Sequence, residues 1–237
     1  MLDVTVLATG STGNCYTLRS GETVIMLDCG LAFNKLHRLM NFQLPRMILV
    51  THEHGDHAKA AKEYLDRGVD VCMTTGTAEA LKLKPHHRLL PMTPEWDKFF
   101  LKNDIRIENF HVKHDAAEPC GFIIQDKDDR VLYLTDAGEV PPLKGQFTKI
   151  LIEANHSEVD ISERLKDGTL DISQCRRITQ THLSIEKALD FLESANLSKV
   201  KEIHLIHLSS RHGNGGQYKA LVEMMTGKTT YVASNKR

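Results

Sequence analysis

Short apolar runs of β type occur in two blocks along the chain, and this pattern most restricts what the chain can fold into. Runs of this type in the first block lie at 3–9, 15–20, 23–29, 46–52 and 69–75. Those of the second block lie at 104–114, 120–127, 130–138 and 149–156, and a later one at 201–209. Turn residues bound each run, as expected of strands. Helical patterns follow at 56–68, 76–84, 183–197 and 215–227. Two β-rich blocks, each followed by helices, predict an α/β (α+β) fold of two packed sheets with helices outside.

The chain length and the absence of linkers predict a single domain over residues 1–237. A chain of 237 residues can bury a substantial core, and no repeat, low-complexity tract or Pro/Gly/Ser-rich linker divides it. The formal net charge is -1. Such a balance gives no global basic field, so any binding of nucleic acid must come from a local patch.

Cysteine usage and hydropathy predict a cytoplasmic protein without a membrane span. The five cysteines are scattered and contain no C-x-x-C pair, which argues against a disulfide framework and a cysteine zinc cluster. The chain start lacks the basic and apolar regions of a signal peptide, and no apolar stretch approaches the ~20 residues of a span.

The run VTHEHGDH concentrates metal-capable side chains directly after an apolar strand pattern. Alternation along an extended segment sends His52 and His54 to the same side, so that one cation can receive both imidazoles. Gly55 allows a sharp change of direction, after which Asp56 and His57 can face a second cation. The alternative to a metal site is a solvated loop that happens to be rich in histidine. The mixture of imidazoles and carboxylate suits zinc, or manganese and iron under other supply conditions.

Further metal-capable residues stand at the ends of later β-type runs. These are His114, Asp136 and His207. A carboxylate at Asp136 can bridge two cations, and each cation then gains a third histidine while leaving room for water or substrate.

The order of LDCG, THEHGDH, a lone histidine, LTDAG and a final strand-borne histidine resembles the metallo-β-lactamase superfamily of metallohydrolases. The resemblance implies a four-layer αββα sandwich and two divalent metal ions, zinc with manganese as the alternative. One ion would be held by His52, His54 and His114, and the other by Asp56, His57 and His207. Asp136 would bridge them, and Asp28 would orient the ligands from behind.

Two later segments, LIEANH and THLSIEKA, resemble the tRNA 3′-end processing endonuclease. This resemblance implies that His182, poised by Glu153, delivers a proton to the leaving group, and Asp56 is the third expected catalytic residue. The alternative for His182 is a structural role near the start of a helix. No long Gly/Pro-rich insertion for gripping tRNA is present, and the chain more closely resembles the small bacterial and phage branch of single-strand exonuclease-like proteins.

The primary hypothesis is therefore a two-metal phosphodiesterase acting on single-stranded nucleic acid. The alternative is a phosphodiesterase for a cyclic signalling nucleotide, of the phage anti-defence type. A non-catalytic metal-bound scaffold is a third hypothesis; its signature would be a missing ligand, and none is missing. A homodimer is implied only by the resemblance.

Several other polar residues have weaker assignments. Arg211 and Ser209 are candidate contacts of a substrate phosphate, with a plain surface position as the alternative. His156 is kept in reserve, whereas His86 and His87 are expected to be solvated. The run GSTGN is either a phosphate-binding loop or a simple turn.

Overall fold

The computed structural model describes residues 1–93, 98–101 and 105–236, and these residues form two units. The N-terminal unit comprises residues 1–111, 116–129 and 234–236, and the C-terminal unit comprises 112–115 and 130–233. Each contains both strands and helices, so the predicted mixed α/β class is confirmed. The prediction of a single domain over 1–237 stays a prediction.

The N-terminal unit contains a mixed sheet whose strands follow one another in sequence order. These strands are β1 (Asp3–Ala8), β2 (Cys15–Ser20), β3 (Thr23–Leu27), β4 (Met47–Leu49), β5 (Asp70–Thr74) and β6 (Leu89–Met92). The first three pair antiparallel and the rest parallel. A separate antiparallel set consists of β7 (Lys98–Leu101), β8 (Ile105–His111) and β9 (Cys120–Gln125).

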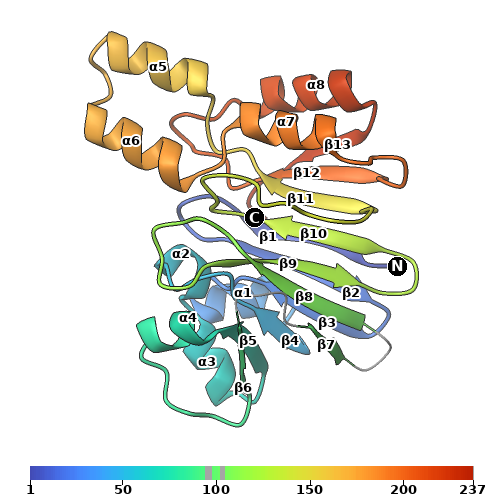
Figure 1. Cartoon of the computed structure of the whole chain (residues 1–237). Helices are drawn as coiled ribbons and strands as arrows, with labels where there is room; N and C mark the ends of the chain where they lie inside the picture. The colour runs from blue at the N-terminus through green and yellow to red at the C-terminus, as the bar shows by residue number, and fades with distance from the viewer. Residues whose placement is uncertain (94–97, 102–104, 237) are drawn as a thin grey trace. The chain divides into compact units, whose positions relative to one another are not determined.

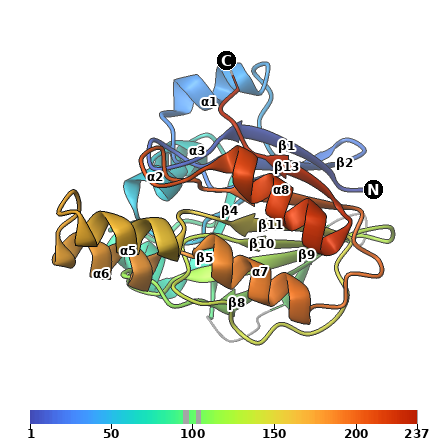
Figure 2. The ribbon, with the colours of Figure 1, turned by 90° about the horizontal axis from the view of Figure 1, so that it is seen from above.

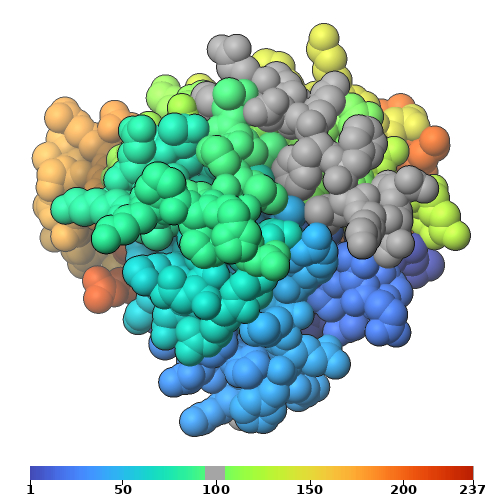
Figure 3. Space-filling model, turned by 90° about the horizontal axis from the view of Figure 1, so that it is seen from below, coloured from blue at the N-terminus to red at the C-terminus, as the bar shows by residue number. Residues whose placement is uncertain are grey.

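The described helices of the N-terminal unit lie between successive strands of the mixed sheet (Figure 1). They are α1 (Phe33–Leu39), α2 (Gly55–Ala58), α3 (Ala61–Asp66) and α4 (Thr75–Ala80). Buried residues of α1 and α3 form one apolar core with strand residues such as Met26, Ile48 and Val71. This core fixes β4, and with it the start of the polar segment that follows. In Figure 3, α3 and the segment after α4 lie side by side on one face of the unit.

The single helix expected over 56–68 is wrong, because the structure divides it into α2 and α3. The break has a clear cause in backbone hydrogen bonding. The Asp56 carbonyl, which would accept from Ala60 in a continuous helix, instead accepts from Asn14 N at 2.7 Å. The Ala60 amide donates to the Cys29 carbonyl at 3.0 Å. Contacts with segments distant in sequence therefore override local helix propensity.

The C-terminal unit is built on parallel strands. They are β10 (Arg130–Leu134), β11 (Lys149–Glu153), β12 (Glu202–Ile206) and β13 (Thr229–Val232). Helices α7 (Ile185–Ser194) and α8 (Gly215–Thr226) pack on one face of these strands (Figures 1 and 2). Because parallel strands share one carboxyl edge, the polar residues that follow β10, β11 and β12 meet there.

Two helices that the sequence patterns did not indicate lie between β11 and α7. These are α5 (Glu158–Lys166) and α6 (Ile172–Thr181), which form a pair projecting beyond the strands (Figures 1 and 2). Ser157 and Asp171 cap their N-termini by accepting backbone hydrogen bonds. Within the described residues, no helix is long and apolar enough to cross a membrane.

Candidate metal centre

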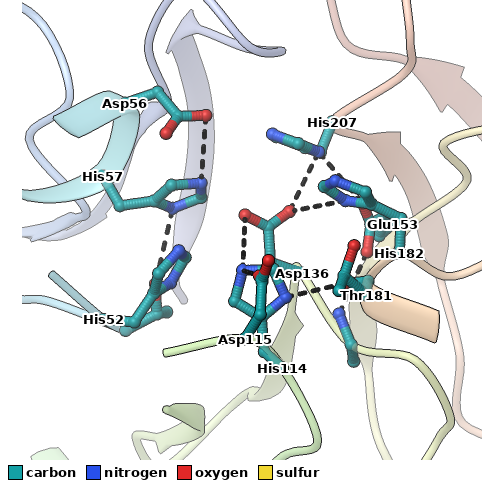
Figure 4. Close-up of polar contacts among 12 residues, drawn as sticks. His52, Asp56, His57, His114, Asp115, Asp136, Glu153, Thr181, His182 and His207 are labelled. Atoms are coloured by element: carbon teal, nitrogen blue, oxygen red, sulfur yellow. Dashed lines mark hydrogen bonds and ion pairs between the residues drawn. The ribbon is translucent and has the colours of Figure 1, made fainter. Parts of the chain in front are cut away.

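The histidine motif of the N-terminal unit occupies the turn between β4 and α2 (Figure 4). The ring of His52 lies with its centroid 4.6 Å from that of His54 and 4.2 Å from that of His57. Asp56 adds a carboxylate oxygen 3.6 Å from His57 Nε2. The motif therefore brings its imidazoles and its carboxylate together, as the sequence predicts.

Asp28 lies fully buried behind this motif and accepts hydrogen bonds from two of its neighbours. Its carboxylate accepts from the Thr51 amide at 2.8 Å, from the Thr51 hydroxyl, and from His57 Nδ1 at 2.7 Å. Because an ionised carboxylate only accepts, His57 carries its proton on Nδ1. The lone pair of its Nε2 then points away from Asp28. That tautomer is the one a metal ligand needs, and an oriented imidazole is what the sequence predicted of Asp28.

A residue that the sequence analysis missed, Asn14, lies buried on the other side of the same imidazole. Its Nδ2 donates to His57 Nε2 at 3.0 Å, while its Oδ1 accepts from Gly10 N at 2.9 Å. The asparagine that ends the GSTGN run was the only available signal. The amides of Gly10 and Gly13 donate within this unit, which favours the turn interpretation of the run.

Backbone hydrogen bonds join the segment around Asp28 to the metal-capable motif. Cys29 N donates to the His57 carbonyl at 2.7 Å, and Gly30 N donates to the Asn14 carbonyl at 2.9 Å. A Cβ atom at Gly30 would lie 2.8 Å from Asn14 N and would overlap the Asp56 carbonyl. Only glycine fits at this approach, so the "DCG" segment fixes the backbone that carries Asp56 and His57.

A second cluster forms at the carboxyl edge of the C-terminal unit (Figure 4). One ligand atom from each of four residues lies within 4.8 Å of the others: Asp136, Glu153, His182 and His207. His182 Nδ1 is 2.8 Å from Glu153 Oε1, and His207 Nδ1 is 2.9 Å from the same oxygen. The rings of His182 and His207 stack with centroids 5.3 Å apart. The predicted proton pair, Glu153 and His182, is therefore in direct contact.

The electrostatics of this cluster favour a charged His182 beside an ionised Glu153. Burial lowers the pKa of His182, but the charge of Glu153 and the contact with Asp136 outweigh it and raise the pKa to about 9. Burial raises the pKa of Glu153, and the His182 charge outweighs this and leaves it below its usual value. Glu153 also accepts from Ala137 N and Leu183 N, which holds its carboxylate in place.

His114 belongs to the same unit and contacts the same cluster. Its Nδ1 donates to the Thr181 carbonyl at 2.8 Å, and its Nε2 lies 3.8 Å from Asp136 Oδ2. Burial lowers the pKa of His114, which favours the neutral imidazole that binds a metal. Thr181, the last residue of α6, was not singled out from the sequence.

Three of the candidate residues adopt left-handed backbone conformations at the ends of strands. The φ angles are 55° at Asp28, 45° at Asp136 and 52° at His207. Each of these residues lies one or two positions beyond a strand. Such conformations are uncommon for residues other than glycine and concentrate at functional sites.

The weaker candidates lie outside these two clusters. The ring of His156 is buried, with no hydrogen-bond partner found among the described residues, and burial lowers its pKa to about 4. Ser209 accepts from the amides of Arg211 and His212, which is a local turn contact. Arg211 is exposed, and its carbonyl accepts from Arg164. The phosphate-binding roles of Ser209 and Arg211 remain predictions.

The donor sets of both clusters fit a divalent metal ion. Each combines imidazoles with carboxylates, the chemistry that zinc and manganese share, and second partners orient the rings of His57 and His114.

Comparison with known families agrees with this donor chemistry. Residues 23–208 match the β-lactamase superfamily domain. The chain belongs to this family. The predicted superfamily is thereby confirmed, and with it a metal-dependent hydrolase.

Two curated bacterial relatives cover most of the chain. It is 31% identical over 230 residues to the protein named exodeoxyribonuclease YycJ of Bacillus anthracis, covering 88% of this chain and 83% of that protein. It is 30% identical over 227 residues to exodeoxyribonuclease WalJ of Streptococcus pneumoniae, covering 87% of this chain and 81% of the relative.

Solved structures of low sequence identity share the fold. The metallo-β-lactamase fold protein YhfI from Bacillus subtilis gives a TM-score of 0.76 at 16% identity, covering 99% of this chain and 97% of the other. Zinc-bound PqqB from Methylobacterium extorquens gives a TM-score of 0.72 at 12% identity, covering 99% of this chain and 98% of the other. The short form of human tRNase Z gives a TM-score of 0.61 at 16% identity, covering 98% of this chain and 96% of the other. The metallo-β-lactamase type of fold is therefore confirmed.

Proposed function

We propose that the protein is a two-metal phosphodiesterase that hydrolyses phosphodiester bonds in single-stranded nucleic acid. The observation that carries the proposal is the contact between Glu153 and His182 at 2.8 Å, beside Asp136 and His207. Hydrolysis of a phosphodiester releases an alkoxide, and a protonated histidine held by a carboxylate can neutralise it. The names of the two bacterial relatives, both exodeoxyribonucleases, support a polymeric substrate.

The chain's own residues supply the proton. Because Nδ1 of His182 faces Glu153, its Nε2–H is the group that can donate to the leaving oxygen as the P–O bond breaks. Glu153 stays ionised throughout and stabilises the imidazolium before transfer. With its pKa raised to about 9, metal-free His182 is protonated at neutral pH and is ready to act as an acid.

The metal ligands remain those predicted from the motif order. One cation would be held by His52, His54 and His114. The other would be held by Asp56, His57 and His207, and Asp136 would be a ligand of both. Two cations would supply a nucleophile from bound water and neutralise the charge that develops on the phosphate. We propose zinc as the metal, with manganese as the alternative that the same donors accept.

A substrate panel tests the proposal directly. The chelated protein, reloaded with zinc or manganese, is assayed on a single-stranded oligodeoxynucleotide, an oligoribonucleotide and a cyclic mononucleotide. We expect metal-dependent cleavage of an oligonucleotide, abolished by Asp136→Ala and reduced about 100-fold or more by His182→Asn. Cleavage of the cyclic mononucleotide alone, or full activity in the chelated sample, would contradict the proposal.

A further inference from the structure

A groove of about 580 Å³ opens on the surface of the N-terminal unit beside the histidine motif. Its lining begins at Glu53 and Gly55, the residues that alternate with His54 in the motif. It continues along α2 and α3 and ends at residues 81–86, after α4. These segments, coloured from cyan to green, occupy one face in Figure 3. The groove therefore adjoins metal-capable residues of its own unit.

The floor of the groove is apolar. Ala58, Ala61 and Leu65 are buried at its base, and the partly exposed Leu81 and Leu83 pack against the same core. A floor of this kind can accept the faces of unstacked bases but offers nothing to the charged backbone of a duplex, in which base faces are hidden.

The rim of the groove is basic. Lys59, Lys62, Lys82 and Lys84 line it, against the two carboxylates of Glu53 and Asp66. Asp66 pairs with Lys62 at 2.6 Å, and one oxygen of Glu53 accepts from the Ala117 amide at 2.7 Å, so four lysines against two carboxylates leave the rim positively charged.

The remaining three lysines of the rim are exposed. No ion pair of Lys59, Lys82 or Lys84 is found within the described part of the chain. A local basic patch of this size exists although the whole chain carries a net charge of -1. Three separate ammonium groups call for a ligand with several negative charges spaced along it.

We propose that this lysine groove binds the single strand on one side of the bond that is cut. The inference rests on the proposed function and deepens it, because it makes the substrate a polymer. Phosphates lie along Lys59, Lys82 and Lys84, and bases lie on Leu81 and Leu83. A cyclic mononucleotide has a single phosphate, which cleavage would require at the metal-capable motif, and so leaves these lysines without a role.

Two histidines at the far end of the groove extend the same surface. The rings of His86, which lines the groove, and exposed His87 stack with centroids 4.5 Å apart. His86 Nδ1 accepts from the Arg88 amide at 3.2 Å, which fixes its ring. An aromatic stack with an open face is a platform on which a further base can stack without sequence preference.

The test compares the Lys82→Gln/Lys84→Gln variant with the control Lys35→Gln/Lys127→Gln, which loses the same charge at exposed positions of the same unit. Binding of a fluorescent oligothymidylate to the full chain is measured over a salt series by anisotropy in chelator, so that no cleavage occurs. Each phosphate contact with a single strand contributes about 0.7 to the slope of log K against log salt. For the groove variant, which loses two contacts, we expect the slope of log K against log salt to be shallower by about 1.4. We expect it to bind the oligothymidylate about 25-fold more weakly at ~0.1 M salt.

A second readout is the ratio of activity on the oligonucleotide to activity on bis(p-nitrophenyl) phosphate, a diester too short to span the groove. We expect this ratio to fall in the groove variant and to stay at the wild-type value in the control. If neither substrate is cleaved, the proposed function fails, and the binding series still tests the groove. Equal slopes in the two variants would overturn the inference. So would a wild-type dimer that the groove variant breaks, since a second copy would then cover the groove.

Discussion

Replacing Gly30 by alanine is expected to displace the backbone that carries two of the proposed metal ligands. The alanine Cβ would lie 2.8 Å from Asn14 N and would overlap the carbonyl of Asp56. Both neighbours are backbone atoms joined to each other by the 2.7 Å bond from Asn14 N to the Asp56 carbonyl. No flexible side chain can yield, so the start of α2 must move by roughly 1 Å to restore normal contact.

The expected cost follows from this geometry. Overpacking of a buried position costs about 1–3 kcal/mol, and overlap with backbone places Gly30→Ala near the upper end. At about 2–4 °C per kcal/mol for a chain of this size, the melting temperature of the metal-free protein should fall by roughly 6–12 °C. Because Asp56 and His57 move with the start of α2, the affinity of the protein for zinc should fall at least about tenfold.

The control is Gly55, the first residue of α2, the helix that carries Asp56 and His57. A Cβ at Gly55 meets nothing within 4 Å, so Gly55→Ala should change neither quantity appreciably. Scanning calorimetry of chelated protein gives the stability, and titration with zinc against a chromophoric chelator gives the affinity. Equal melting temperatures and equal zinc affinities for the two variants would refute the reasoning about the Gly30 approach.

Two further substitutions test the buried carboxylates. Asp28→Asn places an amide where Thr51 and His57 both donate, so metal affinity should fall about 10–100-fold in the same titration; an unchanged affinity would show that Asp28 does not orient His57. Glu153→Gln removes the charge that raises the pKa of His182 to about 9. Stability from the charged His182 is fully present below its ordinary pKa of 6.5 and is lost as pH rises through about 9. The melting temperature of the metal-free wild-type protein should therefore fall across this pH interval, and that of the variant should fall less. Parallel curves of melting temperature against pH would contradict the charged state of His182.

The sequence could predict which polar side chains lie together where the signal is a local motif or a motif resemblance. The histidine motif follows an apolar strand directly, and the structure has His52, His54 and His57 side by side. Glu153 and His182 were paired through motif resemblance, and they are in contact across 29 positions of sequence.

What the sequence could not predict depends on distant partners. The division of α2 from α3 arises because Asn14 and Cys29 take hydrogen bonds that a continuous helix would keep. Helices α5 and α6 were not predicted because each is short and mostly polar, and each buries a single residue, Ile161 or Thr181. Asn14 and Asn155 were missed because an asparagine near a turn has an ordinary local explanation. Only the fold reveals that Asn155 donates to the His207 carbonyl.

The left-handed backbone at Asp28, Asp136 and His207 has a consequence for how such a protein evolves. Each of these conformations costs a residue with a Cβ about 1–3 kcal/mol, less for aspartate than for histidine, and glycine almost nothing. Glycine at these positions would relieve the backbone strain, but it would also remove buried side chains whose hydrogen bonds reach Thr51, His57 and Glu153. The strained backbone is therefore held by the surrounding contacts, and a relative with glycine at position 207 should have lost the strain and the proposed metal ligand together.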